Sequence, residues 1–128
     1  MTTVAAYADV QDSITRLEQP GDPDQEVATF QANGVLNSPR PILTFRVDPD
    51  VSAGDVNLQM ELNDQKIVDQ TFDTGTHRAW TEVVDTGIIQ DGTNTLTAKL
   101  RAANGVSDAP AGSSISISDV SCIFPVDV

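Results

Sequence analysis

The chain has 128 residues, enough for one hydrophobic core and too few for two domains of ordinary size. Nineteen Asp and Glu against seven Lys and Arg give a formal charge of −12 at pH 7. Nucleic acid is therefore not expected as a partner, because phosphate binding needs clustered Lys and Arg. No membrane span is expected either, since no apolar run approaches the roughly 20 residues that cross a bilayer.

The acidic residues are spread along the chain, and only two of the basic residues are Lys. Such a surface stays hydrated in concentrated salt, where screening removes most of the self-repulsion. We therefore favour a salt-loving, haloarchaeal setting, with an ordinary acidic protein as the alternative. The N-terminus has no basic segment followed by a continuous apolar one, so a cleaved signal peptide is not indicated. Cys122, the single cysteine, lies in an apolar run and is expected to be buried and inert.

Residues 1–25 contain two short apolar-alternating pieces, followed by the breaker-rich stretch EQPGDPDQ. The short side chains of Ala5 and Ala6 can contribute little to a core. We expect this segment to be an N-terminal arm or an edge strand, outside a domain formed by residues 26–128.

The clearest element is a β-hairpin over residues 54–72. Its first strand alternates apolar Val56, Leu58, Met60 and Leu62 with polar Asn57, Gln59 and Glu61. This alternation predicts a half-buried strand with one polar face. Residues 63–65, Asn-Asp-Gln, provide the turn, and the chain then returns with β-branched and aromatic residues.

Further strands are expected at residues 26–36, 41–47, 79–84, 93–101 and 114–128. In the last of these, Ile115 and Ile117 occupy odd positions, whereas Val120, Cys122 and Phe124 occupy even ones. A β-bulge near Ser118 and Asp119 would keep both sets on the core face. About seven to nine short strands with turns between them predict an all-β fold, an antiparallel two-sheet β-sandwich of jelly-roll type.

A short motif links the chain to a known group of jelly rolls. Gly92, Asn94 and Leu96 form a G-x-N-x-L pattern at the start of a strand, which resembles the late-strand signature of galactose-binding-like jelly rolls. Gly permits a tight turn there, and the Asn side chain can bond loop backbone. The wider texture is similar to small acidic jelly-roll accessory proteins of haloarchaeal tailed viruses, several of which decorate virion surfaces.

Three carboxylates form the candidate metal site. Asp48, Asp50 and Asp55 lie close together in sequence around a polar stretch, and oxygen ligands on a flexible loop suit Ca²⁺. The alternative is a solvated turn in an Asp-rich protein. No other cofactor is indicated.

No catalytic set is indicated, and we expect that the protein is not an enzyme. His77, the single histidine, lies in a polar loop and is expected to be solvated. Only four Glu occur, and none suggests the paired carboxylates of glycoside hydrolysis. Trp80 could stack on a sugar ring, but a Trp at strand period favours a core position.

These observations predict a structural virion protein, either a capsid decoration or a turret component. It would act at the virion surface, or otherwise reside in the cytoplasm of a halophilic host. Its partners would be copies of itself, with a trimer favoured, and a capsid protein. The alternative is a carbohydrate-binding, lectin-like jelly-roll module whose partner is a glycan.

Overall fold

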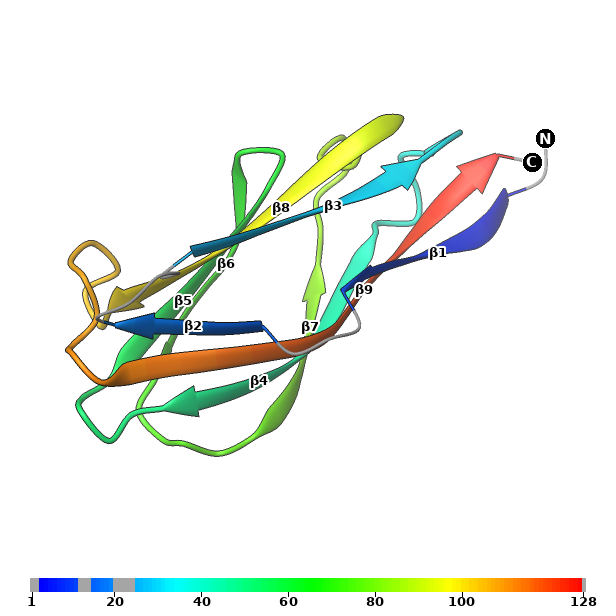
Figure 1. Ribbon diagram of the computed structural model, residues 1–128. Coiled ribbons are helices and arrows are strands. Elements are labelled where there is room, and N and C mark those ends of the chain that lie inside the picture. The colour runs from blue at the N-terminus through cyan, green and yellow to red at the C-terminus, as the bar shows by residue number, and fades with distance from the viewer. Residues whose placement is uncertain (1–2, 12–14, 20–24, 128) are drawn as a thin grey trace.

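The computed structural model describes residues 3–11, 15–19 and 25–127. Its strands are labelled in Figure 1. In chain order these are β1 (Thr3–Gln11), β2 (Thr15–Gln19), β3 (Gln25–Ala32), β4 (Ile42–Asp50), β5 (Val56–Leu62), β6 (Gln65–Phe72), β7 (Arg78–Val83), β8 (Gly92–Ala102) and β9 (Ser113–Asp127). Across these described stretches, no helix occurs that could cross a membrane.

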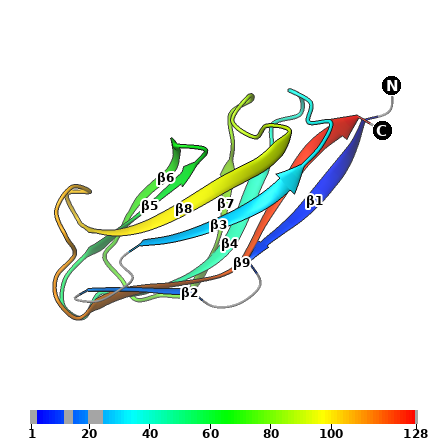
Figure 2. The same cartoon turned by 45° about the horizontal axis from the view of Figure 1, so that its top comes forward.

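Two antiparallel sheets stack face to face, as Figures 1 and 2 show from two directions. One sheet has the order β1-β9-β4-β7, with β2 also paired to β9, and the other has the order β3-β8-β5-β6. The predicted all-β antiparallel sandwich is confirmed. Within the segment predicted as an arm or edge strand, β1 and β2 are both hydrogen-bonded to β9. The rest of residues 1–25, at 1–2, 12–14 and 20–24, lies outside the described residues.

Alternating apolar side chains from both sheets fill a single core. In β4, Leu43, Phe45 and Val47 point inward and are at most 2% exposed. Trp80 packs against the rim of this core, as predicted, with its ring centroid 6.2 Å from that of Phe72 at a steep interplanar angle of 74°. Cys122 is fully buried, also as predicted, and burial raises the pKa of its thiol to about 12.

The predicted β-bulge in β9 is present. Opposite it on β4, Thr44 pairs with Ser121 and Arg46 pairs with Ser118, so three steps along β9 face two along β4. The extra residue is Asp119, whose φ of 53° lies in the left-handed region. One added residue thus keeps the apolar side chains on either side of it facing the core.

The predicted hairpin is present as β5 and β6, but its first strand is not half-buried. The turn residues Asn63 and Asp64 both have positive φ, 51° and 66°, as a two-residue hairpin turn requires. The outward-facing Asn57 and Gln59 are only 2% and 8% exposed. The loop of residues 103–107 covers them, and Gln59 Nε2 donates to the Gly105 carbonyl at 2.6 Å. The outer face is polar as predicted, but the expectation of a half-buried strand was wrong, because sequence alternation does not reveal a loop that folds back over the sheet.

β4 runs farther than predicted, through Asp48 and Asp50, which the sequence placed in a turn. Pro49 lies within the strand and is buried. A proline is tolerated there because the pairing of β4 with β7 ends at Val47, so this part of β4 has a partner on one side only.

The side chain of Asn94, in the G-x-N-x-L motif, bonds loop backbone as expected. Asn94 is fully buried, and its Oδ1 accepts hydrogen bonds from Gln90 N at 2.9 Å and Asn63 Nδ2 at 2.7 Å. Its Nδ2 donates to the carbonyls of Gln90 at 2.8 Å and Gly92 at 3.3 Å. One side chain therefore joins the loop before β8 to the hairpin turn.

Candidate functional site

A polar groove follows β9 along the outer face of the five-stranded sheet. Its floor consists of the β9 side chains that alternate away from the core, namely Ser114, Ser116 and Ser118 and, beyond the bulge, Ser121. Ser114 and Ser121 are only 5% and 8% exposed although they face away from the core. Small side chains in this strand are recessed between longer ones on the strands beside it. We call this feature the serine-floored groove.

Longer polar side chains from neighbouring strands form the walls of the groove. At one cross-strand position, Ser116 lies between Asp48 of β4 and Arg16 of β2. Two residues toward the start of β9, Ser114 lies between Asp50 of β4 and Glu18 of β2. Two residues in the other direction, Ser118 is paired with Arg46 of β4. Across the floor of hydroxyls, a carboxylate thus faces a guanidinium at Ser116, and two carboxylates face each other at Ser114.

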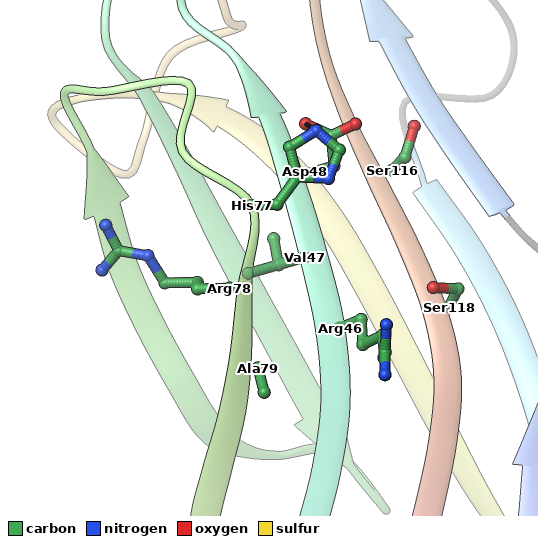
Figure 3. A pocket seen from close by; sticks show the side chains of 8 residues that line it. All are labelled: Arg46, Val47, Asp48, His77, Arg78, Ala79, Ser116 and Ser118. Carbon is green, nitrogen blue, oxygen red and sulfur yellow. Dashed lines mark ion pairs between the residues drawn. The ribbon is translucent and has the colours of Figure 1, made fainter.

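Two adjoining hollows lie along this groove. The larger, about 510 Å³, is lined by Arg46, Asp48, His77, Ser116 and Ser118, among others. Figure 3 shows the His77 ring against Asp48 with Ser116 beside them on β9, Ser118 farther along β9 near Arg46, and the Arg78 side chain pointing away. The second hollow, about 450 Å³, shares Asp48 and Ser116 with the first. The two hollows therefore form one continuous groove.

The charged groups of the groove are held in exposed ion pairs. His77 Nε2 lies 3.1 Å from Asp48 Oδ1, and Arg46 Nε lies 3.4 Å from Asp119 Oδ2. The His77 side chain is 80% exposed, so the predicted solvated position is confirmed, with the addition of a carboxylate partner. Exposed pairs of this kind contribute only about 0–1 kcal/mol to stability. A ligand can therefore replace them at little cost.

Asp50 is held as a carboxylate at the end of the groove. Its Oδ1 accepts hydrogen bonds from Ser52 Oγ at 2.7 Å and Ser52 N at 3.0 Å. These bonds favour the ionised form and lower the pKa of Asp50. A general acid requires the opposite shift, so Asp50 is suited to accept hydrogen bonds and not to protonate a leaving group.

The structure separates the three carboxylates of the predicted calcium site into different surroundings. The side chain of Asp48 is paired with His77, that of Asp50 with Ser52, and Asp55 is an exposed residue just before β5. Among the described residues, no three His, Cys, Asp or Glu side chains gather closely enough to hold a metal ion. The calcium site stays a prediction.

Beyond the bulge, the same face becomes apolar. Four cross-strand neighbours form a row over four strands, in the order Val83, Ile42, Ile123 and Tyr7. Tyr7 is 64% exposed, Val83 55% and Ile123 38%. Tyr7 Oη lies 2.9 Å from Ser121 Oγ, so the ring leans over β9 toward the groove. We call these four residues the apolar row.

Sequence reasoning missed Tyr7 because its segment looked like a weak contributor to the core. A signal was available, since Tyr7 alternates with Ala6 and Ala8, which pack against the core in β1. An aromatic residue out of phase with the buried side chains of a strand must face solvent or a partner.

No known family model and no curated protein matches the sequence. Several solved structures match in fold. The CBM36-1 domain of a multidomain xylanase from the hindgut metagenome of Trinervitermes trinervoides aligns with a TM-score of 0.56 at 12% identity, over 98% of this chain and 100% of that domain. Dimeric latent PorU from Porphyromonas gingivalis aligns with a TM-score of 0.60 at 13% identity over 93% of this chain. BuGH86 in complex with neoagarooctaose aligns with a TM-score of 0.50 at 13% identity over 98%.

The chain spans 13% of the length of PorU and 20% of that of BuGH86, so it resembles one part of each. At these identities the likeness concerns the fold alone, and it supports the jelly-roll architecture predicted from the sequence.

Proposed function

We propose that the protein is a carbohydrate-binding module whose serine-floored groove holds a glycan. The observation that carries this proposal is the composition of the serine-floored groove, which is lined by hydroxyl, carboxylate, guanidinium and imidazole groups. Every sugar hydroxyl both donates and accepts hydrogen bonds. A floor of Ser116 and Ser118 between Arg46 and Asp48 offers both functions within one hollow.

Other ligand classes fit this groove less well. Nucleic acid needs clustered cations, whereas Arg46 is paired with Asp119 and Arg16 with Glu18. An apolar peptide would leave the serine hydroxyls and carboxylates without partners, at a cost of about 1–3 kcal/mol for each buried group. The fold likeness to the CBM36-1 domain, which belongs to a xylanase, is compatible with glycan binding but does not carry the argument.

The predicted virion role, with its trimer, capsid partner and halophilic host, stays a prediction. No feature of the described residues favours a capsid protein as the occupant of the polar groove. The absence of enzymatic activity also stays a prediction. Glycan binding, the alternative drawn from the sequence, has the stronger support because the groove supplies the chemistry it needs.

A binding panel tests the proposal. The purified protein is run through native gels that contain xylan, agarose, mannan or mixed-linkage β-glucan, and affinities are measured by calorimetry. We expect retardation by at least one polysaccharide. Asp48→Ala should weaken that binding about tenfold, because a hydrogen bond to a charged group contributes about 1.5–3 kcal/mol and each 1.4 kcal/mol is a factor of ten.

Lys66→Ala is the matched control, since Lys66 forms a similar exposed pair with Asp69 on the opposite sheet, 3.4 Å apart. It should leave glycan affinity unchanged. The proposal fails if no polysaccharide in the panel binds, or if Asp48→Ala and Lys66→Ala behave alike.

A further inference from the structure

We infer that the ligand is an internal stretch of a linear polysaccharide about five sugar units long, with Tyr7 as a stacking subsite beyond the bulge. This inference rests on the proposed function and specifies the size and shape of the ligand. It joins two features that share one strand, the serine-floored groove and the apolar row.

The two features lie in line along β9. β4 borders the whole path, from Asp50 opposite Ser114 to Ile42 opposite Ile123. On the other side of β9, β2 borders the polar part and β1 borders the part beyond the bulge. The face therefore offers one path along β9, with the hollows of the serine-floored groove in its polar half and exposed apolar side chains in its other half, and we call this path the channel.

The length of this channel sets the length of the ligand. β4 has nine residues, which at about 3.3 Å per step give a channel of about 26 Å. A pyranose ring built from single bonds of about 1.5 Å advances a glycan chain by about 5 Å, so the channel accommodates about five units. The channel lies on the outer face of the sheet, so a bound chain can extend beyond it at both ends.

Tyr7 is placed to stack on a sugar ring. Its hydroxyl is held by Ser121 at the floor of the channel, and the side chain is still 64% exposed. An aromatic ring pinned at its polar end presents its apolar face to a ligand with little loss of conformational freedom. Arg46, which lines the polar hollow, is paired with Asp119 at the bulge, and a bound chain that reaches Tyr7 would replace this exposed pair.

A length series tests the inference. Oligosaccharides from disaccharide to octasaccharide, derived from the best-binding polysaccharide of the panel, are titrated by calorimetry into the whole protein. We expect affinity to rise at least tenfold between disaccharide and pentasaccharide and then to level off. Tyr7→Ala should weaken binding of the pentasaccharide about tenfold, leave the disaccharide unchanged, and spare the thermal midpoint because the residue is exposed. Tyr7→Phe should retain most of the affinity.

Val27→Ala is the control, because Val27 is a similarly exposed apolar residue, 49% exposed, on β3 of the opposite sheet. It should leave affinity for every length unchanged. The inference is wrong if affinity already levels off at the disaccharide, or if Tyr7→Ala affects all lengths equally or none; polysaccharide binding itself would still stand. It is also wrong if Tyr7→Ala lowers the solution mass without changing glycan affinity, since the row would then be a contact between copies. Absence of all binding overturns the proposed function as well.

Discussion

Replacing Asn94 by Ala should destabilise the protein by about 3–4 kcal/mol. The substitution removes four hydrogen bonds, to Gln90 N, Gln90 O, Gly92 O and Asn63 Nδ2, from a side chain that is fully buried. Each such bond contributes about 1 kcal/mol net. A loss of this size is a large part of the roughly 5–15 kcal/mol that stabilises an ordinary domain.

Urea unfolding followed by the fluorescence of Trp80, the single tryptophan, measures this loss. Asn94→Asp preserves the volume but places an oxygen against the carbonyls of Gln90 and Gly92, so it should be at least as destabilising at neutral pH. Asn104→Ala is the control, since the Asn104 side chain likewise bonds loop backbone, through the NH groups of Val106 and Ser107, but in an exposed loop where water can replace it. If Asn94→Ala and Asn104→Ala both cost less than about 1 kcal/mol, the network does not stabilise the fold as argued.

Three further predictions concern the reactivity of the Cys122 thiol, the loss of stability at acid pH and the dependence of stability on salt. Cys122 should resist iodoacetamide at pH 8 in the native state and react once urea unfolds the chain, because burial raises its pKa to about 12; rapid labelling of the native protein would contradict this. The bond from Asn57 Nδ2 lowers the pKa of Asp69, so the ionised carboxylate stabilises the fold above its unfolded pKa of about 3.9, and that stability is lost as pH falls through the lower folded value. Asp69→Asn should therefore flatten the acid side of a pH–stability curve, and an unchanged curve would count against the bond. With a net charge of −12, the urea midpoint should be higher in about 2 M than in about 0.1 M NaCl, and an equal midpoint would remove the argument for a high-salt setting.

The sequence predicted those parts of the fold that depend on neighbours in the chain. The hairpin turn at Asn63, the change of phase at Asp119 and the bonds of Asn94 to the backbone of its own loop each depend on residues close by in the chain. The groove could not be predicted in this way. Alternation indicates that Ser116 faces away from the core, but its neighbours Asp48 and Arg16 lie 68 and 100 residues away in sequence. Which strands border β9 is decided by long-range pairing, and a single sequence carries little information about it.

The position of the loop of residues 103–107 over the sheet could not be predicted from the sequence either. Gln59 alternates as a surface residue should, yet the chain near Gly105 returns across the sheet and covers it. Nothing in the composition of the segment between β8 and β9 specifies which face of the sheet it covers. The same limit applies to Asp48 and Asp50, which were expected in a polar turn after the strand of residues 41–47, whereas pairing with β9 extends that strand through both.

The single extra residue in β9 limits how this strand can change in length. Deleting Asp119 would move every residue on one side of it to the opposite face, so either Ile115 and Ile117 or Cys122 and Phe124 would be turned toward water. Losing two adjacent residues would keep the alternation on each side but would shift one half of β9 by two residues along β4. An insertion or deletion of an odd number of residues in this strand would therefore expose core side chains. Substitutions at Ser116 or Ser118, in contrast, can alter the floor of the serine-floored groove without disturbing the core.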